Sequence, residues 1–163
     1  MALTTEELIA SLQNEVRILL HLASKIDRTK LDYRPTAKQR STIELLRYLS
    51  IMGPGLTNAI KTGAFDGAAW GAAVAAADAK NLDQILADIE AQSAMYAKEL
   101  PGVDFTGEIE LFGRKASRGY LAVNLILSGY AAYRTQLFMY LKACGREELN
   151  TFNLWQGVDG QMG

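Results

Sequence analysis

The apolar residues of this chain recur at spacings of three and four, and this period restricts the fold to packed helices. The first such segment begins with Thr4 and Glu7, a pair typical of a capping box in which each side chain satisfies a backbone N–H at the helix start. Its apolar stripe then runs along one helix face and consists of Leu8, Leu12, Val16, Leu19, Leu20, Ala23 and Ile26. The pattern predicts a long first helix that ends near Asp27.

A second helix follows a polar loop. Residues 27–40 lack the period, and Pro35 disfavours helix at the residue before it. Ser41 and Glu44 form a second capping-box pattern, so we expect the helix to begin there. Pro54 should kink or end it. The buried face is predicted to hold Ile43, Leu46, Leu49 and Met52.

Residues 63–80 are rich in Gly and Ala and predict a crossing segment with a short helix at about 68–77. Asn81 and Gln84 mark the start of the third long helix, which the apolar period carries to about Leu100. The order of these elements predicts a bundle with a long crossover between its second and third long helices.

The last part of the chain predicts one more long helix and a docked tail. Residues 108–112 alternate polar and apolar and indicate a short extended piece. Ser117 is the expected cap of a helix over about 118–143, with Gly145 just past its end. The tail 146–163 should dock because it contains Leu149, Phe152, Leu154 and Trp155.

Residues 1–163 are therefore predicted to form a single all-α domain. A length of 163 residues with 49% hydrophobic residues suits one packed core. A net charge of −1 argues against nucleic-acid binding, which needs a basic surface. Cys144 is the only cysteine, and we find no secretory leader or membrane span, so we expect a cytoplasmic protein without a membrane partner.

Two stretches carry a resemblance to a known group. Leu31-Asp32-Tyr33-Arg34-Pro35 leads into Ser41-Thr42-Ile43-Glu44 and Tyr48, and Gly129-Tyr130-Ala131-Ala132-Tyr133-Arg134-Thr135-Gln136-Leu137 opens the later stretch. Together with the helix order, these stretches resemble the DinB/YfiT-like superfamily. The resemblance implies an up-down-down-up four-helix bundle. It also implies metal ligands at three positions, which are histidines in the family and are occupied here by Tyr48, Gly129 and Tyr133.

The sequence predicts that this metal site is lost. A zinc or nickel site of this kind needs two or three imidazoles, and His21 is the only histidine. The two phenols should fill the space that a metal would leave. We therefore expect no cofactor; the alternative is a divalent metal such as zinc or nickel, held by Tyr48 or Tyr133.

A pocket between helices is the main candidate site. Its expected residues are Glu44, Tyr48, Tyr133, Arg134 and Gln136. Arg134 should pair with a carboxylate inside the bundle, and Glu44 is the expected partner.

Other titratable residues have plainer interpretations. His21 is expected to be half-buried, with a general base as the alternative, and Cys144 lies where a helix dipole disfavours a thiolate. Three basic residues surround the start of the last helix: Arg114, Lys115 and Arg118. They indicate either an anion site or a solvated loop, and the solvated loop is the plainer interpretation. The same holds for Arg34, Lys38 and Arg40.

These observations leave three functions open. The leading interpretation is a metal-free bundle, expected to be a homodimer, with a binding or structural role and a small-molecule ligand. The alternative that the resemblance implies is an enzyme, either a metal-dependent hydrolase or a transferase or isomerase that uses low-molecular-weight thiols. The third is a protein-interaction module, suggested by Leu154 and Trp155 in the tail.

Overall fold

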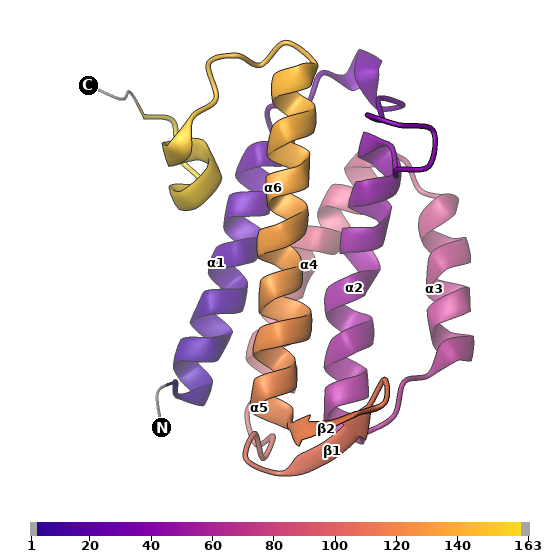
Figure 1. Ribbon diagram of the computed structural model, residues 1–163, viewed down its shortest axis with the longest axis vertical. Coiled ribbons are helices and arrows are strands. Elements are labelled where there is room, and N and C mark those ends of the chain that lie inside the picture. The colour runs from indigo at the N-terminus through magenta and orange to yellow at the C-terminus, as the bar shows by residue number, and fades with distance from the viewer. Residues whose placement is uncertain (1–2, 161–163) are drawn as a thin grey trace.

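The computed structural model describes residues 3–160, which form an all-α bundle with one small hairpin. Three of its long helices are α1 (Thr5–Ala23), α2 (Thr42–Thr62) and α4 (Leu82–Glu99). The last is continuous through α5 (Arg118–Leu121), a π-helical turn η2 (Ala122–Leu127) and α6 (Ser128–Ala143). In Figure 1, α1 and α6 run one way and α2 and α4 the other, so the predicted up-down-down-up order is confirmed.

The starts of three helices follow the capping residues. In α1 the Glu7 N–H donates to Thr4 Oγ1 at 3.1 Å, and the Thr4 N–H donates to Glu7 Oε2 at 2.7 Å. The same reciprocal pair forms between Ser41 and Glu44 in α2. Asn81 caps α4 in this way too. Each cap satisfies backbone N–H groups that have no partner inside the helix.

Helix α2 continues through Pro54 to Thr62, so of the two predicted outcomes, a kink or an end at the proline, the helix does not end there. Proline has no N–H and leaves the carbonyl four residues earlier, that of Ser50, without its helical partner. The buried Gln92 side chain of α4 supplies donors instead, at 3.1 Å from the Ser50 oxygen and 3.0 Å from the Leu49 oxygen. The helix therefore keeps its carbonyls satisfied across the proline.

The crossover between α2 and α4 contains helix α3 (Gly67–Asp78), as predicted, which lies alongside α2 on the outside of the bundle (Figure 1). The extended piece before the last helix is β1 (Glu108–Leu111), and it pairs antiparallel with β2 (Arg114–Ser117). The second strand was not predicted. The two residues between the strands both have positive φ, 54° at Phe112 and 74° at Gly113, which is typical of a tight hairpin turn.

The core lies where the long helices meet. α1 and α2 each contact both α4 and α6, so α1 and α2 occupy opposite corners of the bundle. Most of the core is aliphatic, but its centre contains two buried tyrosines whose hydroxyl oxygens, of Tyr96 and Tyr130, lie 2.6 Å apart. The Tyr130 hydroxyl also donates to Gln92 Oε1. Within residues 3–160, no helix is both long and apolar enough to span a membrane.

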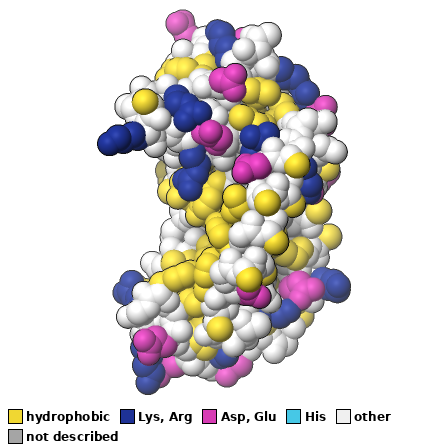
Figure 2. All heavy atoms as spheres, turned by 90° about the vertical axis from the view of Figure 1, so that its right-hand side faces the viewer, with side chains coloured by type: hydrophobic (Ala, Val, Ile, Leu, Met, Phe, Trp, Pro, Cys, Tyr) yellow, Lys and Arg dark blue, Asp and Glu magenta, His cyan; other side chains and the backbone are white. Residues whose placement is uncertain are grey.

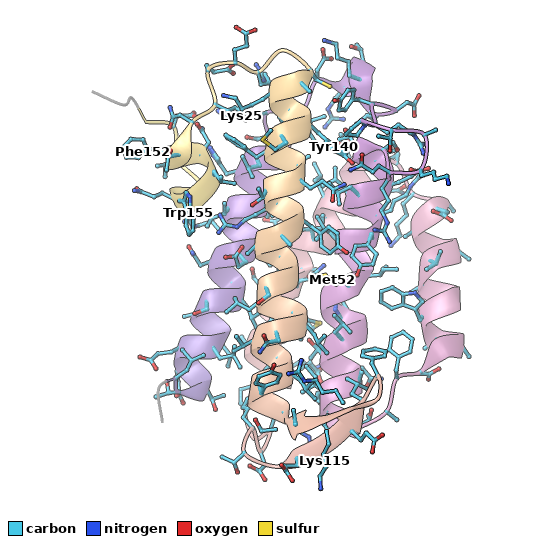
Figure 3. All side chains as sticks on the ribbon, viewed as in Figure 1. Lys25, Met52, Lys115, Tyr140, Phe152 and Trp155 are labelled. Carbon is cyan, nitrogen blue, oxygen red and sulfur yellow. The ribbon has the colours of Figure 1, made fainter. Side chains whose placement is uncertain are left out.

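The segment after α6 packs back on the first helix. A short π-helical turn, η3 (Phe152–Gln156), lies beside α1, and Arg17 donates to the Gln156 oxygen at 2.7 Å (Figure 3). Leu149 is buried, whereas Trp155 is 66% exposed. Just past the C-terminal end of α1, the loop before α2 contains a 3₁₀ turn, η1 (Arg28–Lys30).

Candidate functional site

A cavity of about 630 Å³ lies between α2, α3 and α6, and the three positions singled out in the sequence all line it. Tyr48 projects from α2, while Gly129 and Tyr133 lie one turn apart on α6. The Tyr48 and Tyr133 ring centroids are 5.0 Å apart in an edge-to-face arrangement. We call this cavity the aromatic pocket.

Further rings continue the wall of the aromatic pocket. The ring centroids of Trp70, on α3, and Tyr48 are 6.1 Å apart. The centroid of Phe65 lies 5.5 Å from that of Trp70, and the centroid of Phe112 lies 5.2 Å from that of Phe65. The five rings thus form one row that joins α6, α2, α3 and the hairpin. We call it the aromatic row; its members are Tyr133, Tyr48, Trp70, Phe65 and Phe112.

The rest of the lining is apolar or already hydrogen-bonded. Its aliphatic members come from α2 and the last helix and are Met52, Leu56, Leu125 and Ala132. Asn124 donates to the Tyr120 oxygen and Ser128 to the Val123 oxygen, each at 2.9 Å, so these side chains donate within the last helix itself. No charged residue lines the pocket among the residues that the structure describes.

Figure 2 views the molecule from the α3 side. Hydrophobic side chains gather across the hollowed middle of this face, and charged side chains lie above and below them. A ligand approaching from this side would therefore meet an apolar band flanked by charges.

The residues at the three positions where the sequence resemblance implies metal ligands do not fit a multi-histidine metal site. Burial, followed by the neighbouring Tyr133, raises the pKa of Tyr48 to about 12, so its phenol stays protonated at neutral pH. Gly129 is packed by Met52, whose Sδ would lie 2.9 Å from a Cβ placed there. Figure 3 shows Met52 between α2 and α6. No group of three histidine, cysteine, aspartate or glutamate side chains with metal-site spacing occurs in residues 3–160.

The predicted partner of Arg134 is wrong. Arg134 pairs with Glu15 of α1, with 2.7 Å between Nε and Oε2, and both side chains are almost fully buried. Burial raises the pKa of Glu15 even though Arg134 opposes that shift. Glu44 instead pairs with Arg34 at 3.1 Å. Arg134 follows Tyr133 directly, so the helix turns it away from the aromatic pocket and toward α1.

The predicted site residues therefore separate into different places. Tyr48 and Tyr133 line the aromatic pocket, and Glu44 lines a smaller neighbouring cavity. Gln136 donates to the Tyr140 hydroxyl at 2.5 Å, and that hydroxyl donates to the Arg40 oxygen at 2.8 Å. This bond ties α6 to the loop before α2. The sequence patterns did not indicate Phe65, Trp70 or Phe112 as site residues. Phe112 in particular is positioned by a hairpin turn whose second strand was not predicted.

The remaining titratable candidates lie elsewhere. His21 is within 3.1 Å of the Asn153 amide nitrogen beside the C-terminal segment, and burial lowers its pKa. Burial raises the pKa of the Cys144 thiol, which disfavours the reactive thiolate. Among the basic residues near the last helix start, Arg118 donates to the Ile60 oxygen at 2.9 Å and Lys115 lies 3.6 Å from Glu108, so these charges have structural partners.

Comparison with known proteins supports the fold. No family model matches the sequence, and no curated protein matches it. Among solved structures, the chain is similar to a DinB-like protein, YjoA, from Bacillus subtilis, with 20% identity and a TM-score of 0.67. The match covers 89% of this chain and 96% of that one. The chain therefore has the DinB-like fold over most of its length.

Proposed function

We propose that this DinB-like bundle binds a small, largely apolar aromatic ligand in the aromatic pocket and does so without a resident metal. The observation that carries the proposal is the aromatic row around an uncharged cavity, at the positions where the sequence resemblance places metal ligands. Tyrosine rings and a glycine occupy the places of three imidazoles there.

The size and lining of the pocket support binding. Its volume of about 630 Å³ is within the range of small-molecule sites, roughly 300–1,000 Å³, which are mostly apolar with a few polar groups. Aromatic walls favour a flat ligand, because rings stack edge to face or offset with a gain of about 0.5–1.5 kcal/mol beyond their area.

The chemistry of the pocket favours binding over catalysis. A general base must be able to accept a proton near neutral pH. Tyr48, with its pKa raised to about 12, is a protonated phenol there, and the side chains of Asn124 and Ser128 already donate to helix carbonyls. We infer a binding role from these groups.

Energy transfer from Trp70 tests the proposal. Replacing Trp155 by Phe leaves Trp70 as the only tryptophan, so its emission reports on the pocket wall. We expect the neutral probe 6-propionyl-2-dimethylaminonaphthalene to quench Trp70 and to shift its own emission to the blue.

The pocket-filling change Ala132→Trp, made in this Trp155→Phe background and read from the probe's own emission, should abolish that shift. The matched control Ala143→Trp lies at the exposed end of α6, outside the pocket lining, and should leave it intact. Equal loss in both variants, or no binding by the parent protein, would refute a ligand in this pocket.

Metal content tests the second half of the proposal. We expect mass-spectrometric analysis, after dialysis without chelator, to find no stoichiometric transition metal. About one zinc, nickel or iron per chain would contradict it and would favour the enzyme alternative.

A further inference from the structure

We propose that the ligand of this protein is an aromatic acid, with its rings against Tyr48 and Trp70 and its carboxylate between Arg40 and Arg47. This inference rests on the proposed function and names the chemical class of the ligand. Both arginines line a second cavity of about 280 Å³, which shares Tyr48 and Trp70 with the aromatic pocket. The two rings thus line both cavities, and the arginines line the second one.

Arg40 is placed by the aromatic row. Its guanidinium carbon lies 4.2 Å from the centroid of the Tyr48 ring, a stacking geometry that holds the cation over the ring face. Within residues 3–160, no carboxylate lies within ion-pair distance of it. The Arg40 charge is therefore held at the cavity without an anionic partner.

Arg47 is one residue before Tyr48 on α2 and has few partners. One of its Nη atoms donates to the Lys80 oxygen at 3.1 Å, while its Nε is buried without an acceptor among the described residues. A buried donor without a partner is uncommon in folded proteins and calls for an explanation. Guanidinium groups bind carboxylates through paired N–H donors, so an anionic ligand would complete the bonding of this side chain.

The two carboxylates of the second cavity do not balance these arginines. Glu44 is already paired with Arg34 at 3.1 Å, and the Ser41 N–H, followed by Arg34, lowers the pKa of Glu44. Asp78 at the end of α3 is the remaining negative charge. The balance of Arg40 and Arg47 against Asp78 leaves one positive charge, which favours an anion.

Two matched probes test the inference by titration calorimetry. The anion 2-naphthoate and the uncharged 2-naphthamide have the same rings and nearly the same shape. We expect the protein to bind naphthoate about tenfold more tightly, which corresponds to one charge-assisted hydrogen-bond pair. Arg47→Met and, separately, Arg40→Gln should remove this preference, which is measured in each variant as the ratio of the naphthoate and naphthamide affinities.

Two further variants test the effect of the opposing charge at Asp78 and the effect of losing an arginine away from the site. Asp78→Asn should raise naphthoate affinity by roughly two- to fivefold, because it removes the opposing charge, and should leave naphthamide unaffected. Arg28→Met is the control, since Arg28 is exposed and paired with Asp83 away from both cavities. It should change neither affinity.

The outcomes separate the two proposals. Equal affinity of the parent protein for both probes would overturn the anion site and leave the aromatic pocket standing. A preference that survives both Arg47→Met and Arg40→Gln would overturn it as well. If neither probe binds at millimolar concentration, the proposed function fails and this inference fails with it. Retained naphthamide binding shows that each variant is folded, and Arg40 is exposed, so its replacement keeps the test valid if Arg47→Met unfolds.

Discussion

At the scale of a single residue, Gly53 has the most demanding surroundings in the core. It precedes Pro54 in α2, and a Cβ at this position would overlap the hydroxyls of Tyr96 and Tyr130 and the Gln92 Oε1. Glycine within a helix is usually less stable than alanine by about 0.5–1 kcal/mol. Here the absent side chain is what allows three buried polar groups to meet.

Gly53→Ala should therefore lower the free energy of unfolding by about 2–3 kcal/mol, because the new methyl group displaces the hydrogen-bonded groups. Gly71→Ala is the matched control, since no atom lies within 4 Å of a Cβ there. It should raise the free energy of unfolding by about 0.5–1 kcal/mol. Urea denaturation measures both, and equal effects would show that Gly53 has no special packing role.

At the scale of elements, α2 depends on its neighbours for both its continuity and its chemistry. Gln92 of α4 satisfies the carbonyls near Pro54, and α6 supplies the ring that packs on Tyr48. Neither contact is local in sequence. The helix that carries the candidate site is thus shaped by side chains from two other helices.

Gln92→Leu should destabilise the protein by about 1–3 kcal/mol, since it leaves the Ser50 and Leu49 oxygens buried without those donors. In a Pro54→Ala background the loss should be smaller by about 1 kcal/mol, because the substituted alanine provides the backbone N–H that proline lacks. Denaturation of the single and double variants forms the test. Additive effects would mean that Gln92 does not compensate for the proline.

The α2–α6 pair also allows a three-histidine metal site to be built at the positions that the sequence resemblance implies. Tyr48→His, Gly129→His and Tyr133→His would place three imidazoles around the aromatic pocket, and Met52→Ala makes room beside position 129. We expect the fourfold variant to bind zinc and to melt higher with zinc than with chelator. Tyr48→His alone should show neither effect. A folded fourfold variant without bound metal or a melting shift would show that the three positions do not converge as described.

At the scale of the whole molecule, the C-terminal segment closes the bundle on the side opposite α3. Trp155 stacks over Arg134 at 5.6 Å, Arg134 also donates to the Leu154 oxygen, and Arg17 holds Gln156 (Figures 1 and 3). The segment thus covers the buried pair of Arg134 with Glu15. Trp155 itself remains largely exposed.

The homodimer expected from the sequence remains a prediction, and Trp155 is the residue through which we expect it to form. Light scattering at micromolar concentration should give twice the mass of the chain. Trp155→Ala should lower the measured mass toward that of the monomer. Thr151→Ala, an exposed change in the same segment, is the control. A monomeric parent protein would contradict this prediction.

Local features of the sequence determined by themselves where the helices begin. The caps Thr4, Ser41, Asn81 and Ser117 act on groups within three residues, so their effect does not depend on the rest of the fold. The period of apolar residues likewise defines which face of each helix is buried. The spacing of Gly129 and Tyr133 predicted that both would lie on one face of α6, and both line the aromatic pocket.

Only the tertiary structure decided which distant groups meet. Arg134 pairs with Glu15 and not with Glu44, because the rotation of α6 about its axis turns that side chain toward α1. Pro54 remains inside a helix because Gln92 of α4 donates to the Ser50 carbonyl, which the proline leaves without a helical partner. Phe112 joins the aromatic row because a hairpin turn holds it there. Such contacts depend on how whole elements pack, and sequence spacing specifies only what happens within one element.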